Sequence, residues 1–383
     1  RQQESLAGIR VIKAYNRKRQ QVQHFEGANT ELMRRSITAD QIMGILMPFT
    51  MFVVNMGIIG ALWIGAIKVD NSTLEVGVIL AFINYLMMIM NGLTSSSMVL
   101  VQIARAIPSA DRVMTVLEEK PTIQNVDEPV QQPIRGTVEF NDVSFAYIKT
   151  NESVLKNISF KVEAGQTIGI IGMTGSGKST LMKLLPRLFD VDSGEILIDG
   201  VPIGQYDLKT LREAIGFAPQ KATLFSKTIG ENILYGHEHA TAKQLLAAIE
   251  QSRSQEFVEK LDEGINHQIT QGATNLSGGQ KQRLAMARAF IRKPSILVLD
   301  DTTSAVDSIS EKAIQATIAA HFADSTKFIV SSKVSSIRGA DKILVIHDGY
   351  LNGMGTHEEL LASNEIYASI VATQVEKGGV LHE

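Results

Sequence analysis

The sequence predicts an α-helical membrane segment with two spans, followed by an α/β domain built on a largely parallel sheet. Two long stretches, 42–67 and 76–104, contain no Asp, Glu, Lys or Arg. Beyond residue 137, short β-rich runs such as QTIGIIG, SILVLDD and DKILVI alternate with helical ones. That alternation is typical of parallel strands joined by crossover helices.

Both uncharged stretches are long enough to cross a bilayer. The first, Ile42 to Ile67, has 26 residues and as a helix reaches about 39 Å, more than the roughly 30 Å of a hydrocarbon core. The second, Val76 to Ala104, follows the short polar stretch 68–75. Residues 1–35 hold eight Lys or Arg against three acidic residues. We therefore place this flank, and everything after Arg105, in the cytoplasm.

Polar side chains inside both spans leave two interpretations open. They are Pro48 and Asn55 in the first span, and Asn84, Asn91, Ser95, Ser96, Ser97 and Gln102 in the second. Such groups either line a substrate pathway or form hydrogen bonds between helices. Two helices cannot enclose a pathway, and the chain begins at Arg1 without Met, so we interpret it as a fragment or processed chain.

Composition excludes several classes of function. The net charge of −3 gives no sign of a nucleic-acid-binding protein, which would normally show a concentrated basic surface. With no cysteine, the chain has no disulfides, thiolate metal sites or cysteine nucleophiles. A stretch rich in Pro, Gln and acidic residues, 121–136, is predicted to be a linker.

The run QTIGIIGMTGSGKST, residues 166–180, predicts a strand, a glycine-rich turn and the start of a helix. Gly172, Gly177, Lys178 and Ser179 fit the P-loop pattern G-x-x-x-x-G-K-[ST]. Backbone N–H groups of such a loop surround phosphates, Lys178 would reach the β and γ phosphates, and Ser179 would bind Mg²⁺. The other predicted contacts to ATP in this loop are Thr174, Gly175, Ser176 and Thr180.

A second apolar strand, SILVLDD, ends in two carboxylates, Asp300 and Asp301. Open α/β sheets bind ligands at the carboxyl ends of their strands. Asp300 is therefore predicted to hold Mg²⁺ through water.

Residues 276–280 read LSGGQ and lie between the P-loop and the Asp300 strand. Here the chain resembles the ATP-binding cassette (ABC) family, whose signature sequence this is. The resemblance covers 137–375 and implies a P-loop ATPase domain with a helical subdomain. It also implies that Ser277, Gly278, Gly279 and Gln280 contact the ATP held by an opposite ATPase domain. The expected division is a membrane segment over 1–120, a linker over 121–136, an ATPase domain over 137–375 and a tail over 376–383.

Further positions match the family. Tyr147 resembles the aromatic residue that stacks on adenine, with Phe145 as the rival candidate. Gln220 in FAPQ resembles the glutamine that senses Mg²⁺ and the attacking water. The loop that touches the opposite ATPase domain is matched by Ser304, Val306 and Asp307.

The membrane segment resembles that of the family's exporters. ESLAGIRVIKAY, residues 4–15, is similar to the cytoplasmic coupling segment before the fifth of six helices, with Leu6, Ile9, Ile12 and Tyr15 spaced as on one helix face. The chain would then hold helices five and six of a half-transporter. Its expected location is the plasma membrane, in contact with the lipid bilayer, with the ATPase domain in the cytoplasm.

Two positions depart from the family's pattern. Asp301 stands where the family has the general base Glu, and Ser332 stands where it has a His. Asp is shorter by about 1.5 Å, one C–C bond, and a misplacement near 1 Å costs roughly 100-fold in rate. These changes resemble the degenerate-site subunit of heterodimeric bacterial multidrug exporters. We therefore expect MgATP binding, weak hydrolysis at this P-loop, and a second half-transporter as partner.

The expected function is ATP-driven export of amphipathic solutes such as drugs or lipids. Three alternatives remain open: a regulatory or structural subunit that binds ATP without turnover, a homodimeric lipid or peptide exporter, and a nontransport ATPase of the superfamily. Two charge-free spans joined to the ATPase domain argue against the last of these. Nothing in the spans identifies the transported solute.

Overall fold

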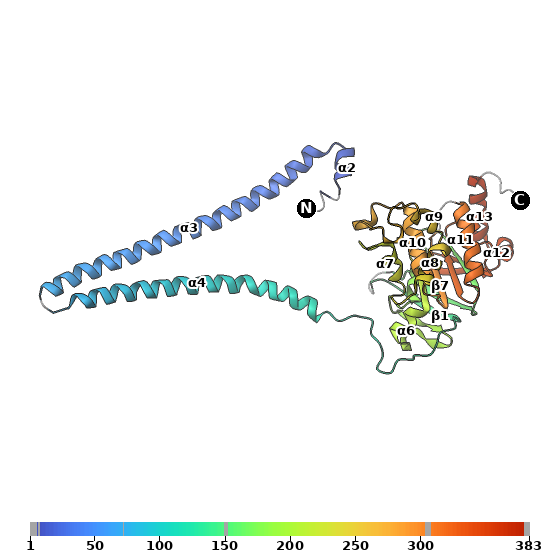
Figure 1. Cartoon of the computed structure of the whole chain (residues 1–383), viewed down its shortest axis with the longest axis horizontal. Helices are drawn as coiled ribbons and strands as arrows, with labels where there is room; N and C mark the ends of the chain where they lie inside the picture. The colour runs from blue at the N-terminus through green and yellow to red at the C-terminus, as the bar shows by residue number, and fades with distance from the viewer. Residues whose placement is uncertain (1–5, 7, 72, 149–151, 303–307, 379–383) are drawn as a thin grey trace. The chain divides into compact units, whose positions relative to one another are not determined.

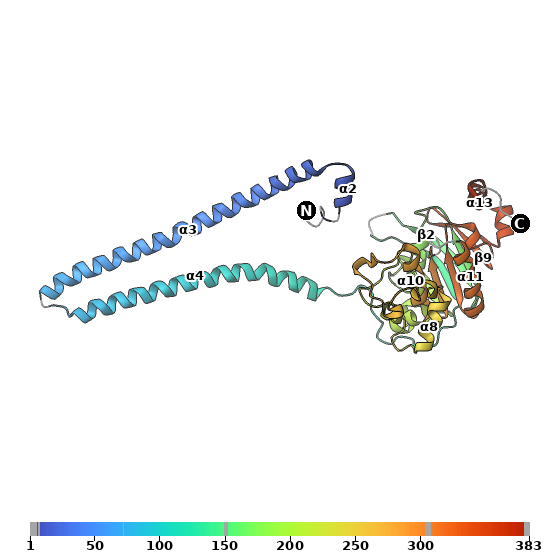
Figure 2. The same cartoon turned by 45° about the horizontal axis from the view of Figure 1, so that its top comes forward.

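The computed structural model describes residues 6, 8–71, 73–148, 152–302 and 308–378. It divides into two compact units, Arg1–Lys120 and Pro121–Glu383. The first unit consists of a short helix and two long helices: α2 (Ile9–Ala14), α3 (Lys18–Asp70) and α4 (Val76–Glu118). Figures 1 and 2 show α3 and α4 running in opposite directions as one hairpin.

Two segments of this hairpin are long and apolar enough to cross a membrane, Pro48–Asp70 in α3 and Val76–Ser96 in α4. The helices approach closely at Gly65, where an added Cβ would lie 2.5 Å from Cδ1 of Ile79. A small residue at that point lets the backbones come together, as is usual between membrane helices. Most other apolar side chains of the hairpin are exposed. Such a surface is stable only against lipid or other helices.

Neither proline in the long helices ends its helix. Pro48 lies inside α3, and α4 continues through Pro108 to Glu118. A proline inside a helix removes one backbone donor and usually kinks or ends the helix. Helix α4 nevertheless extends ten residues beyond Pro108, so the membrane unit ends close to the boundary at Lys120.

The second unit contains two sheets. A four-stranded antiparallel sheet has the order β2-β1-β4-β5, and a six-stranded sheet has the order β10-β9-β3-β8-β7-β6. In the larger sheet β9, β3, β8, β7 and β6 are parallel and only the edge strand β10 is antiparallel, which confirms the predicted parallel core. The strands are β1 (Val138–Phe145), β2 (Leu155–Val162), β3 (Thr167–Ile171), β4 (Ser193–Ile198), β5 (Val201–Pro202), β6 (Ile215–Ala218), β7 (Ile296–Asp300), β8 (Thr326–Val330), β9 (Lys342–His347) and β10 (Tyr350–Gly355).

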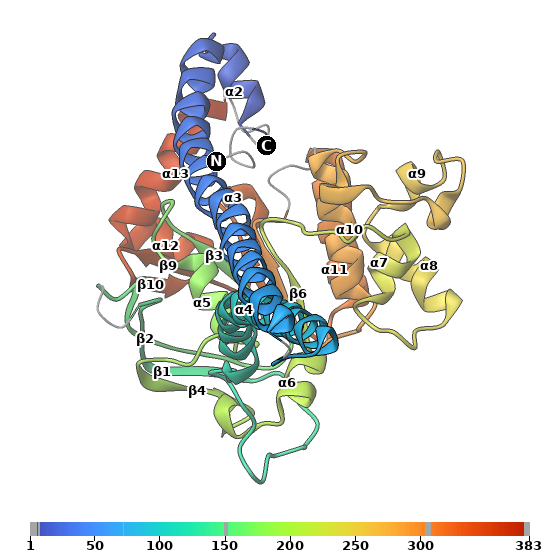
Figure 3. The same ribbon diagram turned by 90° about the vertical axis from the view of Figure 1, so that its left-hand side faces the viewer.

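Helices cover these sheets and add a subdomain of their own. They are α5 (Lys178–Leu184), α6 (Leu208–Ala214), α7 (Ile229–Leu234), α8 (Ala242–Gln251), α9 (Gln255–Val258), α10 (Gly278–Phe290), α11 (Ser308–His321), α12 (His357–Ser363) and α13 (Glu365–Gly378). Figure 3 shows α7, α8 and α9 gathered on one side of the unit, next to α10. They share a hydrophobic cluster separate from the core between the sheets, which confirms the expected helical subdomain.

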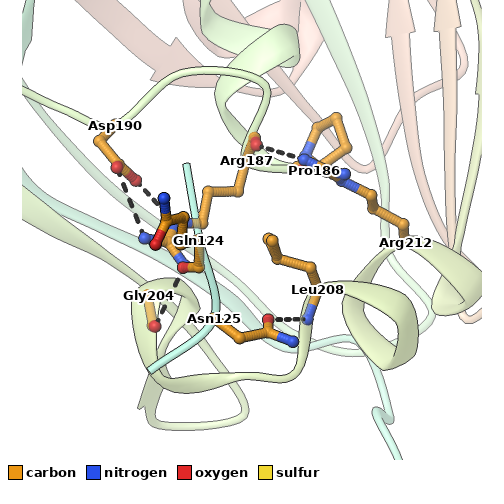
Figure 4. A network of polar contacts seen from close by, with 8 residues as sticks. All are labelled: Gln124, Asn125, Pro186, Arg187, Asp190, Gly204, Leu208 and Arg212. Carbon is orange, nitrogen blue, oxygen red and sulfur yellow. Dashed lines mark hydrogen bonds and ion pairs between the residues drawn. The ribbon is translucent and has the colours of Figure 1, made fainter. Parts of the chain in front are cut away.

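The predicted linker is held against the ATPase unit by hydrogen bonds. Nη1 of Arg187 donates to the carbonyl of Gln124 over 3.3 Å, and Nε of Arg187 forms an ion pair with Asp190 over 2.6 Å. The side chain of Asn125 accepts from the backbone N–H of Leu208 over 2.8 Å. Figure 4 shows these contacts around the start of the linker. The segment is irregular but docked.

The rest of the linker is fastened in the same way. Val130 donates to the carbonyl of Gln205 over 2.8 Å and accepts from the N–H of Asp207 over 3.0 Å. The carboxylate of Asp199 accepts from the backbone N–H groups of residues 135–137 at 2.6 to 3.3 Å. The linker is thus attached to the ATPase unit at its start, its middle and its end, by both side-chain and backbone hydrogen bonds.

Candidate nucleotide-binding site

The turn between β3 and α5 has the backbone geometry of a phosphate-binding loop. Gly172 has no room for a side chain, because a Cβ there would lie 2.0 Å from the carbonyl oxygen of Ile346. Gly177 precedes α5 with φ of 102°, a left-handed conformation that favours glycine. Within the described residues, the hydroxyl of Ser176 is buried at 5% exposure without a hydrogen-bond partner. A buried hydroxyl of this kind needs an acceptor or donor, which a phosphate oxygen would supply.

The side chain of Lys178 is folded back over the loop. Its Nζ donates to the carbonyls of Gly172 and Met173, each over 2.8 Å. Burial lowers the pKa of Lys178, and the charges of Asp301 and Asp300 act in the opposite direction. An incoming phosphate would offer the ammonium group a stronger, charged acceptor than two carbonyls.

The magnesium candidates lie side by side at the ends of α5 and β7. The hydroxyl of Ser179 donates to Oδ1 of Asp300 over 2.7 Å. Asp300 is 1% exposed, and burial raises its pKa, while the hydrogen bond from Ser179 opposes this rise. A cation beside Asp300 would stabilise its ionised form. Oxygen donors of this kind suit Mg²⁺, which usually keeps several waters and binds few protein ligands.

Asp301 and Gln220 come together across the same edge of the sheet. Nε2 of Gln220 donates to Oδ2 of Asp301 over 3.3 Å. Asp301 has φ of 49° and donates its backbone N–H to the carbonyl of Val330 on β8 over 2.9 Å. The carboxylate predicted as a weak base is thus held beside the predicted water-sensing glutamine.

Of the two aromatic candidates for adenine stacking, only Tyr147 offers a ring face to a ligand. Tyr147 is 49% exposed, whereas Phe145 is 3% exposed in the core. The ring of Tyr147 packs edge to face with those of Phe145 and Phe189, with centroids 5.1 and 5.2 Å apart. The rings of Phe145 and Phe189 are tilted against each other, with centroids 5.5 Å apart. The Tyr147 hydroxyl lies 3.0 Å from that of Thr180 in the P-loop helix, which fixes the ring beside the loop.

The signature residues form the N-terminus of α10. The hydroxyl of Ser277 accepts from the N–H of Gln280 over 3.3 Å, and Oε1 of Gln280 accepts from the N–H of Ser277 over 2.8 Å. This capping box starts the helix at Gly278. Ser277, Gly278 and Gly279 therefore stand at a helix N-terminus, where backbone N–H groups favour an anion.

One cavity of about 250 Å³ brings most of the predicted residues together. It is lined by Val154, Thr174, Gly175, Gly177, Lys178, Ser179, Thr180, Gln220, Asp300, Asp301, Val330, Ser331 and Ser332. Although all of 276–280 is described, none of it belongs to this lining, and neither do Tyr147, Gly172 and Ser176. Ser304, Val306 and Asp307 lie outside the described residues. The structure thus separates the signature from this chain's own P-loop.

Two contributors were missed from the sequence. Ser331 lines the cavity next to Ser332. Gln282, on α10, donates from Nε2 to the carbonyl of Gln220 over 3.2 Å and so links the signature helix to the predicted water-sensing residue. No local pattern marks either residue, because both act through contacts between distant segments.

Two family models match separate parts of the chain. The family model described as "ABC transporter transmembrane region" matches residues 1–93, and that described as "ABC transporter" matches residues 155–304. The chain is 38% identical over 377 residues to "Uncharacterized ABC transporter ATP-binding protein YfiB" of Bacillus subtilis, covering 98% of this chain and 65% of YfiB. It is 36% identical over 364 residues to "Probable multidrug resistance ABC transporter ATP-binding/permease protein YheI" of the same species, covering 95% and 62%.

A solved structure, "Structure of a bacterial Atm1-family ABC exporter with ATP bound", superposes with a TM-score of 0.87 at 30% identity, covering 97% of this chain and 65% of that one. The chain spans less than two thirds of the length of these relatives. The transmembrane-region match and the two apolar spans indicate a plasma-membrane protein with a cytoplasmic ATPase domain, as predicted. This chain belongs to the ABC transporter family: it contains a match to that family's transmembrane region, followed by a match to its ATP-binding domain.

Proposed function

We propose that this chain is the ATP-binding subunit of an exporter that couples ATP binding and hydrolysis to efflux of amphipathic solutes such as drugs or lipids. It would pair with a second, different half-transporter, and its own ATP site would turn over slowly. One observation carries the proposal: Asp301 and Ser332, which the family resemblance aligns with the base and the histidine, both line the cavity beside Lys178.

The cavity's residues suit MgATP. Lys178 would exchange its two carbonyl acceptors for phosphate oxygens. Ser179 and Asp300, already joined by a hydrogen bond, would hold Mg²⁺ with Gln220 nearby. The bound cation would neutralise charge on the transferred phosphate.

Hydrolysis requires a base positioned against the attacking water, and this site is poor in that respect. The short side chain of Asp301 already accepts a hydrogen bond from Gln220. Ser332 offers a hydroxyl but no imidazole to the γ-phosphate. A general base contributes roughly 10²- to 10⁴-fold to a rate when well placed, so this site would retain ATP much longer than a complete one.

The signature favours a partner. Ser277 and Gly279 stand at a helix N-terminus outside this chain's cavity, where they can contact ATP on a second ATPase domain. The exposed apolar faces of α3 and α4 would meet lipid and the partner's helices. Asn84, Asn91 and Gln102 on α4 would then face either those helices or the solute.

The proposal is tested by following the γ-phosphate on each chain. The full-length protein with its partner half-transporter, in lipid nanodiscs, is incubated with photoreactive 8-azido-ATP labelled at the γ-phosphate, then crosslinked at increasing times. We expect the label to persist on this chain and to disappear rapidly from the partner. Equal rates of loss on both chains, or assembly as a homodimer that hydrolyses ATP at both sites, would contradict the proposal.

A further inference from the structure

The last described turns of α13 reach the segment that carries Ser332. Nε2 of Gln374 donates to the backbone carbonyl of Ser332 over 2.7 Å. Oε1 of the same side chain accepts from the backbone N–H of Val334 over 2.9 Å. One amide thus satisfies two backbone groups on either side of Lys333, much as a neighbouring strand would.

The helix that carries Gln374 is itself firmly placed. Tyr367 of α13 is fully buried, and its hydroxyl lies 2.7 Å from Nδ1 of His357 on α12. Ile370 and Val371 pack with Tyr367 against the hydrophobic cluster that contains Val334. Gln374 therefore lies on a helix that is anchored by buried side chains, and this anchoring favours a fixed contact between Gln374 and residues 332–334.

The segment after β8 needs such support because it leaves the sheet at the nucleotide cavity. Ser331 donates its N–H to the carbonyl of Ile170 on β3 over 3.1 Å, and this contact continues the sheet. At Ser332 the backbone turns away, and Nζ of Lys333 pairs with Glu311 of α11 over 3.7 Å. The Gln374 amide holds the backbone where Ser332 becomes part of the cavity lining.

We propose that Gln374 is a positioning residue for recognition of the γ-phosphate at this chain's ATP site. By fixing the backbone on both sides of Lys333, it holds Ser332 at the cavity beside Lys178 and Asp301. The inference rests on the proposed function, because it takes Ser332 to face the γ-phosphate. The C-terminal helix is thereby part of the nucleotide site, although its sequence carries no nucleotide-binding motif.

A purely structural role for Gln374 predicts a different result from a positioning role. If the amide only anchored α13, its loss would lower thermal stability and affect every nucleotide alike. If the amide positions Ser332, its loss lowers the affinity for MgATP, which has a γ-phosphate, and leaves the affinity for MgADP, which lacks one, unchanged. The ratio of MgATP to MgADP affinity is therefore the diagnostic measurement.

Two variants are compared with a matched control in the full-length protein with its partner, by titration of MgATP and MgADP at this chain's site. Gln374→Ala removes both hydrogen bonds, whereas Gln374→Glu keeps an acceptor for Val334 and places a carboxylate against the Ser332 carbonyl. The control is Thr373→Ala, because among the described residues the exposed Thr373 hydroxyl donates within its own helix, to the carbonyl of Ser369.

We expect MgATP affinity to fall about 3- to 10-fold in both Gln374 variants, the range expected when a net hydrogen bond is lost, with the Glu variant at least as impaired. MgADP affinity should stay within about twofold, and the Thr373 variant should match the wild type. Equal losses for both nucleotides, or no loss, would overturn this inference while leaving the proposed function intact. A wild-type chain that binds neither nucleotide would overturn both.

Discussion

At the scale of single residues, the site depends on side chains that approach from distant regions of the chain. Lys178 follows β3, Asp300 is the last residue of β7 and Asp301 comes directly after it, and Ser332 follows β8. These strands are neighbours in the parallel sheet, in the order β3-β8-β7. Their carboxyl ends therefore meet at one edge, which is where such sheets bind ligands. We propose that the identities of Asp301 and Ser332 determine how fast ATP bound in this cavity is hydrolysed.

Tyr147 gives a prediction at this scale. Tyr147→Ala should weaken ATP binding by about 1–3 kcal/mol, the amount typical of a lost stacking partner for a base, and Tyr147→Trp should be tolerated. Tyr350→Ala is a matched control, because Tyr350 is also 49% exposed but lies on the edge strand β10, whereas the Tyr147 hydroxyl contacts Thr180 of the P-loop helix over 3.0 Å. Titration of ATP and GTP should show comparable losses for Tyr147→Ala. If Tyr350→Ala weakened binding as much, Tyr147 would not be the stacking residue.

The residues that sequence could predict are those whose role is encoded locally. The P-loop glycines, Lys178 and Ser179 lie within a few positions of one another, and their spacing alone specifies a phosphate-binding turn. Gln282 and Gln374 could not be predicted in this way. Gln282 acts on a residue 62 positions away and Gln374 on one 42 positions away. Their side chains reach these partners only after α10 and α13 have packed against the rest of the domain.

At the scale of elements, sequence predicted the hairpin, the sheet type and an irregular linker, but not how far helices extend or where the linker docks. Pro108 removes one backbone donor and still lies inside α4, because a long helix can tolerate one missing hydrogen bond. Proline and glutamine in 121–136 indicate the absence of regular structure. They carry no information about the docking partner Arg187, which is 63 positions from Gln124.

Arg187 gives a prediction for the linker. Arg187 is 8% exposed. Arg187→Ala would remove the guanidinium group that donates to the carbonyls of Gln124 and Gly204. We expect a loss of about 1–3 kcal/mol in stability of the docked linker, seen as faster tryptic cleavage after Lys120 in the full chain. Lys209→Ala, which removes an exposed cation from α6, should leave the cleavage rate unchanged. An unchanged rate in the Arg187 variant would show that the linker is held by other contacts.

At the scale of the whole molecule, the described residues form a cavity that suits a nucleotide, and the signature residues 276–280 do not line it. The chain spans 65% of the length of YfiB. We propose a division of labour, in which this chain retains ATP in its own cavity and completes the working site of its partner through Ser277 and Gly279. The sequence predicts this division because Asp301 and Ser332 stand where the family has Glu and His.

The most direct measurement compares steady-state ATP hydrolysis by the assembled pair carrying either Ser277→Arg or Asp301→Asn. Because Ser277→Arg also removes the cap of α10, Thr241→Arg is the control, since Thr241 forms the same capping box on α8. We expect Ser277→Arg to lower hydrolysis at least about tenfold, as loss of a contact to the reacting phosphate should. Asp301→Asn and Thr241→Arg should each change it by less than about twofold, because neither acts in the working site. A large loss in Asp301→Asn with little change in Ser277→Arg would show that this chain's own site performs the hydrolysis and would contradict the account.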